Sequence, residues 1–518
     1  MLRPQQFYRF FRRAAQLLRL SFVLVFDRTH AGPIRLRLFF ERLGGAFLKL
    51  GQILSLRLDL LPAAYASELL NLLSRVPARP FEELRPVFRQ AVGADPETVF
   101  KHFDPEPVAS ASLAQVYRAQ LLTGEMVAVK IKRPGTDSLF ETDLFLAQGL
   151  AFILGWFSFF RDFKIREVVR DFVVWTRQEL DFALEARQAE KFKQFLIACP
   201  QNVVPKVYLS WCTREVMVSE FLENIFSIDE VIRQLDRDPN YREVLRTREE
   251  LDLEEISYRF VVDLMRQYLI DGFFHADPHP ANVFLLSHNR LGYFDFGLMG
   301  EAGEERLPLL NIIYGIANED LTFSSRHFLS FTKSAFRAEA ELFKDREPET
   351  YNRYSKIMEK IEEIIVDNLR LDLEQVLASW YNANLEGSSS SSSSSVFSQV
   401  ARRAGNSVML PRAAAAFFRT IAIVDMVALR LNPRFVMLKA FRRFFEEYPI
   451  YRAEELIKNS LLVLPPDPAI DPLSHLSFEQ FLELKERESE RLLVAKERLA
   501  DLVMNYAEKY EEIRKLLR

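Results

Sequence analysis

Three polar residues at fixed spacing stand in an otherwise apolar part of this 518-residue sequence. The stretch HADPHPANVF, residues 275–284, holds Asp277 and Asn282 five positions apart, and YFDFG, residues 293–297, places Asp295 eighteen positions after Asp277. Carboxylate and amide oxygens are hard ligands that suit Mg²⁺. The spacing therefore predicts that these two segments share one ligand, which carries phosphate and metal.

A lysine further upstream completes the set of groups that phosphoryl transfer needs. The reaction requires metal ions across the phosphates, a lysine on the phosphates that are not transferred, and a carboxylate that orients the attacking group. Lys130 lies in VAVKIK, the strand context expected for the phosphate lysine of a protein-kinase fold. Lys130 and Asp277 are the predicted catalytic residues, Asn282 and Asp295 the predicted metal ligands, and ATP or ADP with Mg²⁺ the predicted cofactors.

The alternative for the same segment is an ordinary loop of turn and cap residues, which Pro278 and Pro280 also favour. Each signal is weak alone, but their joint order and spacing favour the phosphoryl-transfer interpretation. His275 and His279 do not predict zinc, because no third nitrogen or sulfur ligand is nearby. We interpret His275 as part of the scaffold.

A phosphate-covering loop is expected ahead of Lys130. The stretch ASASLAQV, residues 109–116, overlays on the kinase pattern G-x-G-x-x-G-x-V with alanine at all three glycine positions. Alanine restricts positive φ and adds a Cβ, so nucleotide should sit differently under this loop. The predicted nucleotide-binding residues of this loop are Ala109, Ser110, Ala111, Ser112, Ala114 and Val116.

Two further motifs carry a resemblance to a known family. FLKLGQILSLRLDLLP, residues 47–62, holds K-x-G-Q as Lys49, Gly51 and Gln52, and QELDFALEA, residues 178–186, holds E-x-D as Glu179 and Asp181. With these motifs, in this order over roughly residues 40–300, the chain resembles the UbiB-type atypical kinases, which are associated with coenzyme Q and other isoprenoid lipids.

The resemblance also has departures. The alanine-rich loop is a family feature, but Ala114 replaces the glycine usual there, and Ser219 replaces the common methionine before Glu220. Glu220 is implied as the hinge residue that binds nucleotide. These two departures concern the fit of the nucleotide.

Helix geometry gives the acidic motif a mechanical interpretation. At about 100° per residue, Asp181 and Glu185 lie about 40° apart on one face, whereas Glu179 lies about 160° from Asp181. If one helix spans this segment, it serves two sides: Glu185 pairs with Lys130, and Glu179 or Asp181 meets Lys49. The alternative is that these are solvated helix charges. In the first interpretation, Lys49 and Gln52 belong to a regulatory segment over the groove where protein kinases bind polypeptides, which blocks protein substrates.

The composition favours a helix-rich α+β fold, because 45 phenylalanines accompany only 17 glycines. Alternating patterns predict a hairpin of SLAQVYRAQLL and MVAVKIKRP, strands in VVPKVYLSW and EVMVSEFL, and a long helix over residues 250–275. The resemblance implies a bilobal kinase-like fold with these parts: an N-terminal helical extension with K-x-G-Q (1–95), an N-lobe with a helical insertion (96–225), a C-lobe (226–387), a poly-serine linker or loop (388–395) and C-terminal helices (396–518). A proline-rich linker, residues 464–472, and a final helix, residues 477–518, are expected within the last part.

Charge, cysteines and hydropathy limit the partners. A net charge of −4 and a pI near 6.1 exclude nucleic acid on electrostatic grounds, and two cysteines cannot build a disulfide framework. No apolar run reaches the roughly 18 to 20 residues of a membrane span. Leu144–Phe160 is expected to be a buried or surface-docking helix. The arginine-rich N-terminus is a membrane-surface helix, an organelle transit peptide or an ordinary packing helix.

The resemblance implies an atypical kinase or ATPase that supports ubiquinone-type quinone synthesis at a membrane surface. Its expected partners are nucleotide, an isoprenoid or quinone-like lipid, the membrane surface and proteins of lipid biosynthesis. Its expected location is the cytoplasm or an organelle matrix, with peripheral membrane attachment, because the tail YAEKYEEIRKLLR cannot span. The alternatives are a nucleotide-gated lipid-binding scaffold without phosphoryl transfer, and a small-molecule phosphotransferase, against which the K-x-G-Q segment argues.

Overall fold

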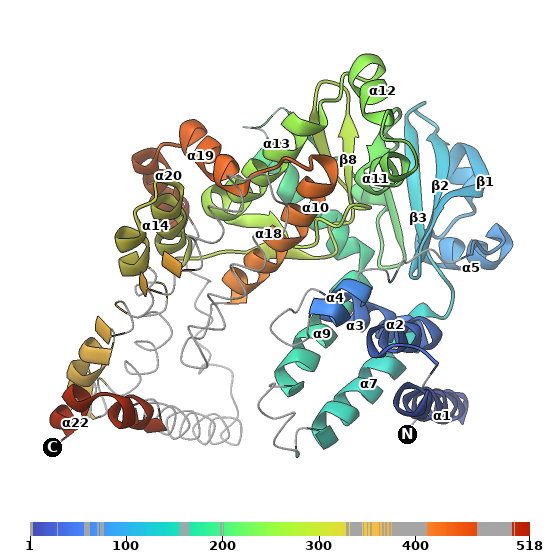
Figure 1. Cartoon of the computed structure of the whole chain (residues 1–518). Coiled ribbons are helices and arrows are strands. Elements are labelled where there is room, and N and C mark those ends of the chain that lie inside the picture. Colours follow the sequence, from blue (N-terminus) through green and yellow to red (C-terminus); the bar gives the residue numbers. More distant parts are fainter. Residues whose placement is uncertain are drawn as a thin grey trace. The chain divides into compact units, whose positions relative to one another are not determined.

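The computed structural model (Figure 1) describes residues 4–27, 29–55, 63–69, 77–154, 165–196, 201–327, 412–463 and 503–517, with residues 72, 156 and 199 and short stretches within 331–375 and at 500–501. The chain forms two compact units. Unit 1 comprises residues 1–252 and 277–299, and unit 2 comprises residues 253–276 and 300–518. Because every predicted site residue lies in unit 1, that unit is described first.

The first part of unit 1 is a group of helices around one apolar core. Its buried side chains include Leu17, Phe40, Phe47 and Phe172. The helices that contribute to this group are α1 (Pro4–Phe26), α2 (Gly32–Leu43), α3 (Gly45–Ser55), α4 (Ala63–Leu69), α7 (Thr136–Leu154) and α9 (Ile165–Glu179). The prediction that the N-terminal region is helical is therefore confirmed for the described residues. The end of the FLKLGQILSLRLDLLP stretch, residues 57–62, lies outside them.

A buried ion pair joins three of these helices. Asp143 of α7 is fully buried and accepts hydrogen bonds from Arg13 Nε of α1 at 2.6 Å and Arg13 Nη2 at 2.9 Å. The same carboxylate accepts the backbone N–H of Ala46, in the first turn of α3, at 3.0 Å. Gly45 has φ +57, and a Cβ there would collide with Asp143. The N-terminus of α3 is thus capped by a side chain from another helix.

An antiparallel sheet follows, with strand order β1-β2-β3-β5. Tyr117, Val129 and Phe88 are completely buried between it and the helix α5. The bounds are α5 (Phe81–Val92), α6 (Pro96–Val99), β1 (Phe100–Ser110), β2 (Ala114–Leu121), β3 (Met126–Lys132) and β5 (Val216–Glu220). The predicted β2–β3 hairpin and the strand in EVMVSEFL are confirmed. Strand β1 was not predicted.

The remainder of unit 1 carries the second sheet, with strand order β4-β9-β8-β6. Its elements are α10 (Phe182–Phe195), β4 (Asn202–Val203), a 3₁₀ turn (Leu209–Trp211), β6 (Phe226–Ser227), α11 (Ile228–Arg237), α12 (Tyr241–Arg248), β8 (Val283–Leu286) and β9 (Arg290–Tyr293). The prediction of a strand through VVPKVYLSW was wrong, because only β4 and one bridge at Val207 form there. Pro205 lacks the N–H that a continuous ladder needs.

Unit 2 is mostly helical. Its elements are α13 (Leu253–Met265), a π-helical turn (Arg266–Asp271), β7 (Phe273–His275), β10 (Met299–Glu301, whose first residue belongs to unit 1), α14 (Arg306–Ala317), α18 (Arg412–Leu431), α19 (Met437–Glu447), α20 (Ile450–Val463) and α22 (Glu511–Leu517). The prediction of one helix over residues 250–275 was wrong at its end. Gly272 adopts a left-handed conformation, φ +71, which stops the helix and starts the strand that precedes Asp277.

The helix-rich α+β class predicted from the sequence is confirmed. The predicted domain bounds stay predictions. The poly-serine run 388–395, the linker 464–472 and the final helix before residue 500 lie outside the described residues. Among the helices that are described, none is both long enough and apolar enough to cross a bilayer.

Candidate nucleotide and metal site

Lys130 and Glu185 form the central ion pair of the site. Lys130 lies in the middle of β3, opposite Val116 on one side and Met217 on the other. Its Nζ donates to both carboxylate oxygens of Glu185, each at 2.8 Å, and lies 4.8 Å from the centre of the Phe182 ring. The Glu185 side chain is only 4% exposed. The pair is the one that the sequence analysis proposed.

A second ion pair joins Lys49 of α3 to Glu179, the last residue of α9. Gly51 allows α3 to approach its neighbours closely, because a Cβ there would overlap Phe40 at 2.7 Å and Leu72 at 2.6 Å. The glycine of K-x-G-Q thus has a packing reason, and it brings Lys49 to its partner. Gln52 lies on the same helix, and its side chain lies outside what the structure describes.

The assumption that one helix spans the acidic motif was wrong. α9 ends at Glu179 and α10 begins at Phe182, with Asp181 in an extended conformation between them. The Asp181 carboxylate accepts the backbone N–H of Leu184 at 3.0 Å, so it caps α10. Of the two candidates for Lys49, Glu179 is therefore the partner. Two helices, rather than two faces of one helix, present Glu179 and Glu185.

The loop around Asp277 is held by its own backbone. Its carbonyl oxygen accepts the N–H of His279 at 2.8 Å and the Nδ2 of Asn282 at 3.1 Å. The carbonyl of Asn282 accepts the N–H of Phe294 at 2.8 Å, which ties this loop to the segment that carries Asp295. The two motifs that opened the sequence analysis are therefore adjacent in unit 1.

Asp295 adopts a left-handed backbone conformation with φ +55, which is uncommon for a residue with a side chain. Its Oδ1 accepts the N–H of Gly297 at 3.3 Å. A Cβ on Gly297 would lie 3.1 Å from that same oxygen and 3.4 Å from the Cγ of Glu179. Gly297 therefore lets the end of α9 pack closely beside Asp295.

These groups lie close enough for their charges to shift the pKa of the two lysines and of the two glutamates. Burial lowers the pKa of Lys49 and of Lys130, but the nearby carboxylates outweigh it and both values are raised. Glu179 and Asp295 act on Lys49, and Glu185 and Asp295 act on Lys130. Burial raises the pKa of Glu179 and of Glu185, and the charge of Asp295 adds to that rise. Asp295 thus influences both ion pairs.

The cluster has an excess of negative charge that a divalent cation would neutralise. Four carboxylates against two ammonium groups leave a formal charge of −2; the carboxylates are Glu179, Glu185, Asp277 and Asp295, and the ammonium groups are Lys49 and Lys130. Within the part of the chain that the structure describes, no three His, Cys, Asp or Glu side chains form a ready-made metal site. Magnesium fits this arrangement, since it commonly takes one or two protein oxygens and completes its shell with phosphate and water.

The alanine-rich loop connects β1 and β2 next to Lys130. Ala109 and Ser110 end β1, Ala111 and Ser112 lie in the turn, and Ala114 and Val116 lie in β2. None of these residues has positive φ, so alanine fits at the glycine positions without backbone strain. The Ser110 hydroxyl accepts a hydrogen bond from Arg133 Nη2 at 2.6 Å.

Glu220 lies at the other edge of the same sheet. It ends β5, pairs in register with Val127 of β3, and its Oε2 accepts the N–H of Lys206 at 3.0 Å. Since Val127 is three residues before Lys130, the structure brings the implied hinge and the phosphate lysine onto neighbouring strands.

Sequence reasoning missed Lys132 as a residue that supports the site from outside the charged cluster. Its Nζ donates to the carbonyl of Leu180 at 2.6 Å and lies 5.4 Å from the Phe182 ring. It therefore stabilises the break between α9, which ends at Glu179, and α10, which carries Glu185. The available signal was its position two residues after Lys130, since alternate residues of a strand share a face.

Comparison with known proteins agrees with this geometry. Residues 71–326 match the family model described as the ABC1 atypical kinase-like domain. The chain is 32% identical over 305 residues to the protein ACTIVITY OF BC1 COMPLEX KINASE 3, chloroplastic, of Arabidopsis thaliana. That alignment covers 57% of this chain and 40% of the plant protein. The chain is 34% identical over 318 residues to a probable protein kinase UbiB of Pseudomonas fluorescens, which covers 60% of this chain and 54% of that protein.

A solved structure is also similar, the complex of Rv3197 with erythromycin from Mycobacterium tuberculosis, with 22% sequence identity and a TM-score of 0.47 over 80% of this chain and 96% of that one. The matches span about half of the length of the curated relatives. Residues 71–326 are therefore similar to the ABC1 atypical kinase-like domain, and the UbiB-type resemblance that the motifs of the chain indicate is confirmed.

Proposed function

We propose that this chain is an atypical kinase or ATPase that binds ATP or ADP with Mg²⁺ and supports the synthesis of an isoprenoid lipid of the ubiquinone type. One observation carries the proposal: the charges of two lysines and four carboxylates influence one another within unit 1. Because the cluster has a net negative charge yet holds two cations, it suits a ligand made of a polyphosphate and a divalent metal.

Each residue has a role in this proposal. Lys130, oriented by Glu185, would contact the phosphates that are not transferred. Asn282 and Asp295 would hold Mg²⁺, which when bound supplies positive charge against the phosphates. Asp277 would orient the attacking group and accept its proton, and its loop is already fixed by Asn282 and Phe294. Residues 109–116 would cover the phosphates, and Glu220 would contact the base.

The position of Lys49 limits which molecule can accept the phosphoryl group. Its ion pair with Glu179 places α3 against the same cluster, where the charges of Asp277 and Asp295 act on the Lys49 ammonium. A segment in that position leaves little room for a polypeptide. The proposed acceptor is therefore water or a small molecule. A phosphotransferase of the aminoglycoside or choline type, the nearest rival of the same fold, is disfavoured by the K-x-G-Q segment.

The lipid part of the proposal rests on similarity. A relative is named as a probable protein kinase UbiB, and the motifs resemble a family associated with coenzyme Q. We extend this to a peripheral association with a membrane surface, in the cytoplasm or an organelle matrix, and to partner proteins of lipid biosynthesis.

Nucleotide titration of the intact chain, with and without Mg²⁺, followed by measurement of phosphate release, tests the proposal. The variant Asp295→Asn should weaken Mg-dependent binding at least about tenfold, because it removes a charged metal ligand. Asp501→Asn is the matched control, since Asp501 is an exposed residue of unit 2. Equal binding and turnover in Asp295→Asn and the wild type would refute the assignment.

A nucleotide-gated lipid-binding scaffold is the second candidate. The observation that favours it concerns Lys49. The charge of Asp295 helps to raise the pKa of the Lys49 ammonium group, which would compete with a metal ion for Asp295. In this case nucleotide binds and lipid co-purifies, but no phosphate is released under any condition that saturates the site.

A further inference from the structure

Helix α1 presents an exposed apolar stripe. Its exposed large apolar side chains recur at helical spacing, and the most exposed is Leu18 at 72%; the others are Phe11, Phe22, Val25 and Phe26. Spacings of seven, four and three residues place Phe11, Leu18, Phe22 and Val25 on one face of the helix, with Phe26 beside them. An apolar face that is exposed from residue 11 to residue 26 of one helix is unusual for a monomeric protein surface.

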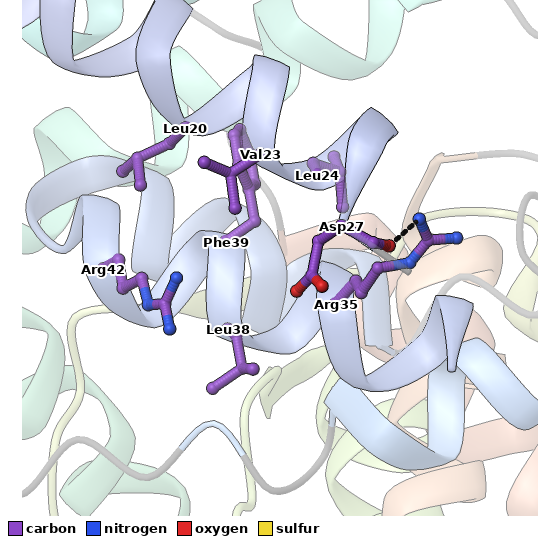
Figure 2. A pocket seen from close by; sticks show the side chains of 8 residues that line it. All are labelled: Leu20, Val23, Leu24, Asp27, Arg35, Leu38, Phe39 and Arg42. Carbon is purple, nitrogen blue, oxygen red and sulfur yellow. Dashed lines mark hydrogen bonds between the residues drawn. The ribbon is translucent and has the colours of Figure 1, made fainter. Parts of the chain in front are cut away.

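The opposite side of α1 is packed, which fixes the orientation of the stripe. Leu17 is buried in the helical core, and Leu20, Val23 and Leu24 line a small pocket with residues of α2 (Figure 2). In that pocket Arg35 Nη1 donates to the backbone carbonyl of Asp27 at 2.6 Å, which ties the end of α1 to α2. The exposed stripe is therefore the outer side of a docked helix.

Helix α7 continues the apolar surface. Phe145, Phe152, Ile153 and the following Trp156 are all more than half exposed, with Trp156 at 70%. The Phe145 ring packs edge-on against Phe10 of α1 at 5.8 Å, and Phe10 packs against Phe11 at 5.6 Å. The stripes of α1 and α7 thus begin at one aromatic cluster.

The charge of α1 indicates what covers this surface. The helix contains Arg9, Arg12, Arg13 and Arg19 and no aspartate or glutamate. Arg12 and Arg19 are exposed and each directly follows an apolar residue at a position next to the stripe. A basic amphipathic helix with aromatic residues binds in the interface of an anionic bilayer, with its apolar face among the acyl chains.

We propose that the exposed faces of α1 and α7, here called the α1–α7 face, dock on an anionic lipid bilayer. Phe11, Leu18 and Phe22 insert between lipids, Arg12 and Arg19 contact phosphate headgroups, and Trp156 lies at the interface. This names the surface for the membrane association in the proposed function. It does not depend on nucleotide chemistry, because docking needs neither Lys130 nor Asp295.

Flotation of the full-length chain tests the proposal, without nucleotide, on vesicles of phosphatidylcholine alone and of phosphatidylcholine with about one third phosphatidylglycerol. The wild type should float with the anionic vesicles, and added salt should weaken the binding. The variant Leu18→Glu with Phe22→Glu should bind at least about tenfold more weakly, since two apolar contacts with lipid become charged. Leu122→Glu is the matched control, because Leu122 is also 70% exposed but lies in the β2–β3 turn.

Quenching of Trp156 fluorescence by brominated lipid is a second measurement, with Trp156→Phe as its blank. A wild type that stays unbound on both vesicles, or a Leu18→Glu/Phe22→Glu chain that floats like the wild type, overturns the proposal. If the wild type is instead a dimer in light scattering and that double variant is a monomer, a second copy covers the face. In each of these cases intact nucleotide binding would show that the proposed function survives.

Discussion

Lys49 and Glu179 pair across two helices that the sequence separates by 130 residues, and the charge of Asp295 acts on both of them. Lys130 and Glu185 form a parallel arrangement between a strand and a helix. The two pairs have the same chemistry but different proposed roles. Lys130 would bind phosphate, whereas Lys49 would hold helix α3 against the charged cluster. This difference can be measured.

Exchanging each pair for neutral residues of similar size separates the roles. The double variant Lys49→Met/Glu179→Gln keeps the net charge of the cluster, so we expect nucleotide affinity within about threefold of the wild type. Lys130→Met/Glu185→Gln also keeps the net charge but removes the phosphate contact, and should lose at least about tenfold. Isothermal titration with Mg-ADP compares them. Equal losses in both variants would contradict the assignment of Lys130 as the phosphate residue.

Asp181 is expected to act through helix α10. Replacing a capping aspartate by alanine costs about 1 kcal/mol of stability, and α10 carries Glu185 in its first turn. Asp181→Ala should therefore lower the unfolding free energy and weaken nucleotide binding modestly, whereas Asp181→Ser, which can still cap, should restore most of both. Chemical denaturation and titration of the two variants decide this. A serine variant as impaired as the alanine variant would mean that Asp181 acts by its charge rather than as a cap.

Arg419 is a predicted positioning residue for the Asp277 loop. Its Nη2 donates to the carbonyl oxygen of Ala276 at 2.9 Å. The Oγ1 of Thr420 lies 3.3 Å from the same oxygen, but it is closer, at 2.8 Å, to the carbonyl oxygen of Ala416. Both residues lie in α18, beyond the matched family segment. Because Ala276 immediately precedes Asp277, Arg419→Ala should reduce turnover about tenfold while nucleotide affinity changes little.

Arg419→Lys should recover part of that turnover, and Thr420→Val should lose less than Arg419→Ala. Steady-state phosphate release and nucleotide titration together check this. A parallel loss of affinity and stability in all three variants would point to a general folding role for α18.

Asp271 predicts a pH dependence of stability. Burial raises its pKa from 3.8 to about 7, and the nearby Asp263, which shares Arg266 with it, adds to that rise. The folded chain therefore holds this proton at pH values where the unfolded chain has lost it. The stabilisation is complete below pH 3.8 and disappears as pH rises to about 7.

Asp271→Asn, which cannot ionise, should accordingly gain stability relative to the wild type as pH rises from 4 to 8, by about 4 kcal/mol at most. Denaturant unfolding across that range measures the difference. The stability of Asp501→Asn should differ from that of the wild type by the same amount at every pH. A constant difference between Asp271→Asn and the wild type would show that Arg266 keeps the carboxylate ionised throughout.

Local patterns predicted some elements well and others not at all. The β2–β3 hairpin alternates apolar and polar residues around a Thr-Gly turn, so Lys130 could be placed on a strand from the sequence. Strand β1 contains Pro105 and Pro107 and is mostly exposed, and both properties argue against a strand until the pairing with β2 is seen.

Other features depend on contacts that no local pattern encodes. The break at Asp181 falls in a continuous helical pattern without glycine or proline, and it is stabilised by Lys132, 48 residues away, through the carbonyl of Leu180. Arg419 and the carbonyl of Ala276 are 143 residues apart. Motif order therefore indicated which charged groups meet, while their supporting residues required the three-dimensional structure.

The carboxylate of Asp143 has a practical consequence for any study of the N-terminus. Arg13 is its counter-ion, and the Oδ2 of the same carboxylate also caps the helix that carries Lys49. Removing the first thirty residues would leave a buried carboxylate without its counter-ion at the start of that helix, so a shortened chain would lose the α1–α7 face and disturb the proposed nucleotide site together. Substitutions confined to exposed side chains keep those two effects apart.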